Sequence, residues 1–149
     1  MVQTFSDNQY IYSVDMMFAY LNTHKHPAKK ISVNEYKDGL EQKSWGDPAA
    51  GIYYSALDVI THPRKYKNEY KRILKANLSY PIIISLDGFI IDGVHRLTKA
   101  YLHNKKEIKA YIFDKQLMKK FIIAKKGEWG KVDKMKMYDF IKRYVDRFC

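Results

Sequence analysis

The sequence predicts an α/β domain in which a small mixed sheet is flanked by helices. The chain has 149 residues, a length that suits one hydrophobic core. Residues 81–113 show a pattern typical of strand, tight turn, strand, helix and strand. The flanking segments carry apolar residues at helical spacing, and the chain ends in an amphipathic stretch at residues 132–148. We therefore expect one compact domain over residues 1–149, with its core at residues 81–113 and a helical extension at residues 114–149.

The composition favours a globular protein with a phosphate-bearing partner. Hydrophobic residues make up 46% of the chain, more than disordered chains contain. The 27 lysines and arginines exceed the 16 acidic residues, and the net charge of +11 favours polyanionic or phosphate-bearing partners. No apolar segment approaches the length of a membrane span, and the single cysteine, Cys149, excludes a disulfide within the chain. These features predict an intracellular protein of the cytoplasm or nucleus, without a membrane partner.

Most elements expected before residue 81 begin at recognisable capping residues. Ser13 is a good N-cap for a helix over residues 14–21. Ser32 and Ser55 each open a pattern that resembles a capping box, with an acid three residues later. The other expected segments are a polar, loosely held start at residues 1–8, a strand at residues 30–33, a helix that follows the Ser32 cap through roughly Lys43, and a basic helix with Pro63 in its first turn.

Residues 44–54 form the most irregular part of the sequence. Gly46, the Asp47-Pro48 pair and Gly51 are typical of turns, so we expect a loop. Trp45 in such a loop is most often a hydrophobic plug. The alternative is a loop that lies over a ligand, with Trp45 or Asp47 in contact with it.

The central stretch has the clearest local signals. Three consecutive isoleucines at residues 82–84 suit a strand that is buried on both faces. Asp87-Gly88 is a strong hairpin signal, and the chain then returns as a second strand. The Asp92-Gly93 turn leads directly into a helix over residues 94–102, and alternating apolar residues predict a strand over residues 108–113.

The C-terminal part is expected to be helical. Asp114 can cap a helix, and residues 127–130 resemble a turn with a packing tryptophan, Trp129. In the final helix, one side carries an apolar set that should face the core. Its members are Met137, Ile141, Tyr144, Val145 and Phe148.

The start of the helix after Gly93 is a candidate phosphate pocket. The first amides of a helix have no intrahelical partner, and the helix dipole there favours negative charge. Arg96 offers a forked, permanently charged donor, and His95 can donate a hydrogen bond or transfer a proton near neutral pH. Asp92 could orient either residue, bind a divalent ion or act as a base. The alternative is an exposed His-Arg pair after a common turn, and the residues alone leave both explanations open.

The run PIII…DGFIIDGVHRLTKAYL…KEIKAYIF, which spans residues 81–113, resembles the core of the ParB/sulfiredoxin-like superfamily. Members share a hairpin, a Gly-x-His/Arg-Arg run that opens a helix, and a further strand. The resemblance is loose outside this run. It implies that the loop and helix start bind nucleotide phosphates through Gly93, the amide of Val94, His95 and Arg96. It also implies a nucleotide such as ATP, ADP or CTP as ligand.

The resemblance includes sulfiredoxins, CTP-binding partition proteins and free-serine kinases. Val94 stands where sulfiredoxin carries its cysteine, and His95 stands where ParB proteins usually carry arginine. The Asp-Gly-x-His-Arg run is closer to the serine-kinase branch, in which an upstream acid acts as base. Glu35, Glu41 and Asp47 are the candidates for that acid.

We therefore expect a nucleotide-binding protein, either a phosphotransferase or a nucleotide hydrolase. In it Asp92, His95 and Arg96 would lie at the phosphates, Trp45 over the nucleotide, and Mg²⁺ at Asp92. The alternative is a module that binds DNA or RNA through basic faces at residues 64–75 and 131–147, with a ParB-like nuclease as a variant. A solvated loop explains His24-x-His26 better than a metal site does.

Overall fold

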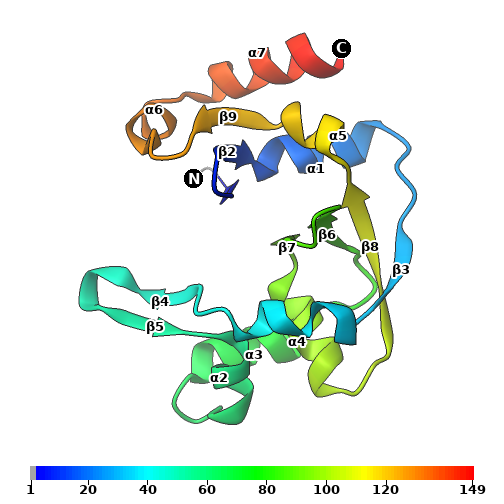
Figure 1. Cartoon of the computed structure of the whole chain (residues 1–149), viewed down its shortest axis with the longest axis vertical. Helices are drawn as coiled ribbons and strands as arrows, with labels where there is room; N and C mark the ends of the chain where they lie inside the picture. Colours follow the sequence, from blue (N-terminus) through cyan, green and yellow to red (C-terminus); the bar gives the residue numbers. More distant parts are fainter. Residues whose placement is uncertain (1–2) are drawn as a thin grey trace. The chain divides into compact units, whose positions relative to one another are not determined.

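The computed structural model describes residues 3–149 and divides into two compact units (Figure 1). One unit is residues 3–27 with Phe113–Cys149, and the other is Ala28–Ile112. Both combine helices with small sheets, so the predicted α/β class with a C-terminal helix is confirmed. That the units form one domain stays a prediction, and each unit is described by itself.

The unit Ala28–Ile112 is built on a sheet with the strand order β3-β8-β6-β7. Its strands are β3 (Lys29–Ser32), β8 (Glu107–Phe113), β6 (Ile82–Ser85) and β7 (Ile90–Asp92). The β6–β7 hairpin turns at Gly88, whose φ of +95° suits glycine. Helix α4 (Val94–Leu102) follows β7 directly, so the expected order of strand, turn, strand and helix is confirmed.

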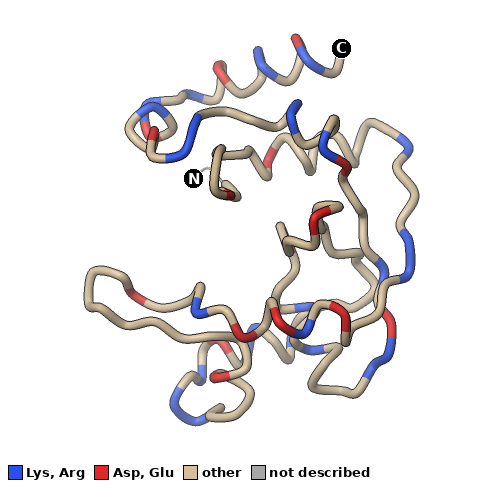
Figure 2. Tube along the Cα trace, in the orientation of Figure 1, with Lys and Arg blue, Asp and Glu red and all other residues tan. Residues whose placement is uncertain are grey.

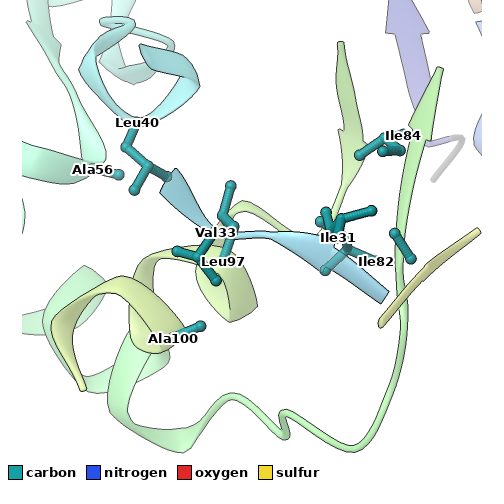
Figure 3. Packing of buried hydrophobic residues seen from close by; sticks show 9 residues of the cluster. Ile31, Val33, Leu40, Ala56, Ile82, Ile84, Leu97 and Ala100 are labelled. Atoms are coloured by element: carbon teal, nitrogen blue, oxygen red, sulfur yellow. The ribbon is translucent and has the colours of Figure 1, made fainter. Parts of the chain in front are cut away.

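This unit has a hydrophobic core of buried side chains (Figure 3). Ile82 and Ile84 of β6 and Leu97 of α4 are fully buried, because an amphipathic helix packs its apolar side on the sheet. The same cluster contains Ile31, Val33, Leu40, Ala56, Ala100 and Ala110. This core fixes α4 on the sheet and therefore fixes the position of the helix start that carries the candidate site.

The rest of the unit consists of short elements. They are the 3₁₀ helices η1 (Asn34–Glu41) and η2 (Pro48–Ala50), strands β4 (Trp45–Asp47) and β5 (Ile52–Tyr54), and helices α2 (Ala56–Thr61) and α3 (Lys67–Lys75). The predicted Ser55 capping box is confirmed, with Asp58 N donating to Ser55 Oγ at 3.1 Å and Ser55 N donating to Asp58 Oδ2 at 2.8 Å.

Two predictions in this region were wrong. Ser32 does not cap a helix, because it is held in the β3–β8 ladder opposite Glu107, and η1 begins after Val33 without a side-chain cap. Residues 44–54 are a β-hairpin rather than a loop. Gly46 lies within β4, where a Cβ would come 2.1 Å from the Ile52 carbonyl oxygen, so its glycine permits close strand pairing. Gly51 supplies the turn, with a φ of +69°.

The unit of residues 3–27 and Phe113–Cys149 has an antiparallel sheet with the order β1-β2-β9. Its elements are β1 (Thr4–Ser6), β2 (Tyr10–Ser13), α1 (Val14–Thr23), α5 (Lys115–Lys119), β9 (Ile122–Lys125), α6 (Trp129–Asp133) and α7 (Met137–Phe148). Ser13 and Asp114 cap α1 and α5 as predicted. Residues 1–8 were expected to be a polar, loosely held start. Residues 1–2 lie outside the described residues, but Thr4–Ser6 form β1, and Asp7 accepts hydrogen bonds from the amides of Gln9 and Tyr10 in the turn to β2.

The C-terminal helix differs from the prediction in its bounds and orientation. The helix expected over residues 132–148 is interrupted at residues 134–136, which separate α6 from α7. Trp129 begins α6 instead of packing in a turn. Met137 of α7 is 73% exposed, and Ile141 and Val145 are also exposed, whereas Phe140 is buried. The buried side is therefore rotated from the expected one. No helix within the described residues is long and apolar enough to cross a membrane.

Candidate functional site

A pocket of about 410 Å³ lies at the start of α4, within the unit Ala28–Ile112. Three parts of the chain meet there: the C-terminal half of α3, the segment of residues 76–80, and the β7–α4 junction. The lining residues are Arg72, Lys75, Ala76, Asn77, Tyr80, Asp92, Gly93, His95 and Arg96. The structure thus brings four of the predicted site residues together with basic residues of α3.

The first turn of α4 begins beside the pocket, although Val94, whose amide the sequence predicted to bind phosphate, is not a lining residue. The first intrahelical bond is donated by Leu97 N to Gly93 O at 2.9 Å, so the amides of Val94, His95 and Arg96 precede the hydrogen-bonded ladder. Gly93 has a φ of +112°, as the turn requires. A Cβ at Gly93 would lie 2.4 Å from Ile82 Cγ2. The absence of a side chain at Gly93 therefore allows the close packing of the β7–α4 junction on β6.

Arg96 is held firmly by its own chain. Its Nη2 lies 2.6 Å from Asp92 Oδ2, and its Nη1 donates to the carbonyl oxygens of Pro81 at 2.8 Å and Tyr80 at 3.3 Å. The exposed fractions of the Arg96 and Asp92 side chains are 20% and 30%. Of the roles considered for Asp92, the contacts therefore favour the orientation of Arg96. Arg96 in turn fixes the segment that forms one wall of the pocket.

His95 is fixed on two sides. Its Nε2 lies 2.8 Å from Glu69 Oε2 of α3, and its ring stacks on Trp45 with centroids 4.7 Å apart and planes 22° apart. A carboxylate accepts hydrogen bonds only, so Nε2 carries the proton in this pair. In the neutral ring, Nδ1 is then an acceptor. The contacts with Glu69 and Trp45 thus fix the position of His95, which lines the pocket.

Sequence reasoning missed Glu69. It is the only acidic residue within residues 64–75, a segment interpreted as a basic face. Glu69 lies 26 residues before His95, and it also accepts a hydrogen bond from Arg72 at 3.2 Å. The position of Glu69 as a single acid among six basic residues was the one signal in the sequence that could have identified it as a site residue. Arg72, Lys75 and Tyr80 were also missed as pocket residues.

The other predicted acids do not line the pocket. Glu35 is an exposed residue in the first turn of η1, and Asp47 Oδ1 accepts a hydrogen bond from Ala49 N at 3.2 Å, where it caps η2. Glu41 ends η1 and is exposed. Trp45 does not line the pocket either, and it reaches the site through its stack on His95.

Among residues 3–149, no group of three or more His, Cys, Asp or Glu side chains lies close enough together to hold a metal ion. His24 Nδ1 is 2.9 Å from the Thr23 hydroxyl, and His26 Nδ1 is 3.0 Å from the Tyr20 hydroxyl. Each of the two histidine rings thus has a hydroxyl partner, and whether they bind a metal stays a prediction.

Comparisons of the chain with family models, with curated proteins and with solved structures find no match.

Proposed function

We propose that this protein binds a nucleotide through its phosphates in the α4 pocket and transfers or hydrolyses the terminal phosphoryl group. The observation that carries the proposal is that Arg72, Lys75 and Arg96 line one pocket at the start of α4, whose first amides precede the hydrogen-bonded ladder. Phosphate binds well where helix amides and cationic side chains point to the same place. The ParB/sulfiredoxin-like resemblance of residues 81–113 supports the same ligand class.

The strength of such a site is sufficient for a cellular nucleotide. A hydrogen bond to a charged group contributes about 1.5–3 kcal/mol net. Two or three of these bonds, together with helix amides, reach about −8 kcal/mol, which corresponds to a micromolar dissociation constant. Lys75 and Arg72 are exposed on α3 and can move to meet the phosphates without breaking the core.

We assign the proton acceptor to His95. Its Nδ1 would take the proton from the attacking hydroxyl or water while Glu69 stabilises the charged ring through Nε2. The stack on Trp45 restricts the rotation of the ring. Mg²⁺ commonly uses one or two carboxylates together with substrate phosphates, and Asp92 is the pocket carboxylate that would serve it. The ion would neutralise charge on the transferred group.

The first test is a thermal-shift series with ATP, ADP, CTP and GTP, each with and without Mg²⁺. A ligand at one hundred times its dissociation constant stabilises a protein by about 2.7 kcal/mol. We expect one nucleotide to stabilise the wild type and Lys71→Ala, and to lose its effect on Lys75→Ala. Lys71 is the matched control because it is an exposed lysine of α3 that does not line the pocket. No shift with any nucleotide, or equal shifts in both variants, would refute the assignment.

Arg96→Ala is a less specific test of the same idea. It removes the ion pair with Asp92 and the hydrogen bonds to the Pro81 and Tyr80 carbonyls. Loss of binding in that variant would therefore follow from a displaced wall as well as from a lost phosphate contact. The variant is informative only beside a measurement of its free energy of unfolding.

A second candidate function is binding of DNA or RNA, and one surface favours it. Residues 64–75 carry six exposed basic residues and a single acid. The basic residues are Arg64, Lys65, Lys67, Lys71, Arg72 and Lys75. Figure 2 marks the positions of lysine and arginine along the backbone in blue. Binding through such a face must weaken steeply with salt. We would measure gel shifts on both nucleic acids between low and physiological salt, and the absence of a shift at low salt would eliminate this candidate.

A further inference from the structure

A second pocket, of about 470 Å³, lies elsewhere in the unit Ala28–Ile112. Strands β3 and β8, the α4–β8 loop and the segment of residues 76–80 form its walls. Its lining residues are Lys30, Leu78, Ser79, Lys105, Glu107, Ile108 and Lys109. None of them belongs to the α4 pocket. The segment of residues 76–80 contributes to both, because Ala76, Asn77 and Tyr80 line the first pocket while Leu78 and Ser79 line the second.

Two of the lysines form a like-charged pair in the sheet. Lys30 of β3 is the direct antiparallel partner of Lys109 of β8. Side chains that are directly opposite start about 5 Å apart, and like charges in that arrangement destabilise the pair. Both side chains line the same pocket, and Lys105 adds a third positive charge. An anion between Lys30 and Lys109 would replace repulsion by attraction.

The other lining residues indicate which chemical groups the rest of the ligand would carry. Leu78 and Ile108 are partly buried and pack against the hydrophobic core, so the pocket has an apolar part. The volume falls within the range of about 300–1,000 Å³ that is typical of small-molecule sites and exceeds what a bare phosphate fills. Ser79 and Glu107 can hydrogen-bond a hydroxyl of the ligand. Three lysines outnumber the single carboxylate, so the site as a whole attracts anions.

We infer that this pocket is a second binding site, for a small organic phosphate whose phosphate lies between Lys30 and Lys109 and whose carbon body covers Leu78. The inference does not depend on the function proposed for the α4 pocket. The shared segment, residues 76–80, gives the two sites a physical connection through which one ligand can alter the other.

The test is a titration of the full chain with phenyl phosphate, followed through backbone amide shifts in NMR. We expect saturable shifts at Ser79 and Lys109, and weaker binding of inorganic phosphate, because it lacks a body to cover the apolar lining. Lys30→Gln and Lys109→Gln should each weaken phenyl phosphate about tenfold, the effect of one charged hydrogen bond. Lys29→Gln is the matched control, since Lys29 is the exposed neighbour of Lys30 in β3 and does not line the pocket.

Two results would overturn the inference. One is the absence of saturable shifts in the wild type. The other is an equal loss of affinity in Lys29→Gln, which would mean non-specific attraction to a basic surface. Lys75→Ala must leave this titration unchanged. A failure of the second-site inference can therefore be distinguished from a failure of the nucleotide site proposed at α4.

The melting temperature without ligand is an independent test of the repulsion between Lys30 and Lys109. At low salt, Lys30→Gln should raise the melting temperature above that of Lys29→Gln, because it removes the repulsion across the ladder. At the same concentration, added phenyl phosphate should stabilise the wild type more than Lys30→Gln, because the variant binds about tenfold more weakly. A Lys30→Gln variant that melts at or below the control would show that the pair is not repulsive and that no counter-anion is needed.

Discussion

Glu69 has a specific task if the α4 pocket performs phosphoryl transfer. Its carboxylate holds His95 Nε2 at 2.8 Å, so Glu69 acts on the reaction through His95. General acid–base catalysis typically contributes about 10²–10⁴-fold to a rate. We therefore expect His95→Gln to lower kcat by that range, and Glu69→Gln to lower it by less, with nucleotide affinity nearly unchanged in both. The measurement is kcat beside a binding constant, for the nucleotide that stabilises the protein.

Glu35→Gln is the control for this prediction. Glu35 was a candidate base from the sequence, but it is exposed in η1 and does not line the pocket. A fall in kcat for Glu35→Gln with full activity in Glu69→Gln would reverse the assignment of the two acids.

Gly93 allows a stability prediction that needs no ligand. Gly93→Ala would place a methyl group 2.4 Å from Ile82 Cγ2 at a φ of +112°. Backbone strain and overpacking together should cost about 3 kcal/mol. Gly88→Ala is a matched control, because Gly88 has a φ of +95° and nothing within 4 Å of its Cβ position, so only the backbone cost of about 1 kcal/mol remains. Urea unfolding of both variants measures the difference, and equal losses would show that Ile82 can move aside.

At the scale of elements, the capping box of α2 should give stability a dependence on pH. The hydrogen bond from the Ser55 amide holds the pKa of the Asp58 carboxyl below its ordinary value of 3.8, with further contributions from the Ser55 hydroxyl and nearby Lys43 and His62. A carboxylate with a lowered pKa stabilises the folded state above the unfolded value, and this contribution is lost as pH falls through the folded value. Stability should therefore decline below about pH 4.

Asp58→Asn tests that decline. The variant should have a lower free energy of unfolding than the wild type at pH 7, by about 1 kcal/mol, and the difference should shrink as pH falls from 4 to 2. Asp87→Asn, in the β6–β7 turn, controls for loss of a surface charge. A difference between wild type and Asp58→Asn that stays constant with pH would mean that the box does not depend on ionised Asp58.

Helices and strands were predictable from the sequence where neighbouring residues determine them. The three isoleucines of β6, the turn at Gly88 and the start of α4 after Gly93 depend on neighbouring residues, and the structure has them as expected. Strand β9 and the hairpin of β4 and β5 were missed, since their residues become strands by pairing with partners. The rotated face of α7 has the same cause, because tertiary packing decides which apolar side is buried.

The candidate site was predictable only in part for a similar reason. Asp92, Gly93, His95 and Arg96 are contiguous, and one motif identifies them all. The contacts of Glu69 and Trp45 with His95 join residues that are 26 or more positions apart. No periodicity or spacing encodes such a contact. The basic residues of α3 were visible as a charged run, but only the packing of α3 on α4 turns that run into one wall of a pocket.

At the scale of the molecule, both pockets and the whole core that supports α4 lie within the unit Ala28–Ile112. That unit is continuous in sequence, whereas the other unit is assembled from the two ends of the chain. A continuous segment with its own core can fold alone, and this one exceeds the ~60 residues at which many domains do so. The division predicts that the ends of the chain are not needed for binding.

A fragment of residues 28–112 tests this prediction directly. We expect it to unfold cooperatively on heating and to bind the same nucleotide with the same dissociation constant as the full chain, because every lining residue of the α4 pocket is retained. Within the fragment, Lys75→Ala should abolish binding without changing the melting temperature, and Leu97→Ala should lower the free energy of unfolding by about 2–5 kcal/mol, since Leu97 is fully buried in the core. Circular dichroism and calorimetric titration provide the measurements. A fragment without a cooperative transition would mean that the two units stabilise one another, and the expectation of a single domain over the whole chain would then hold.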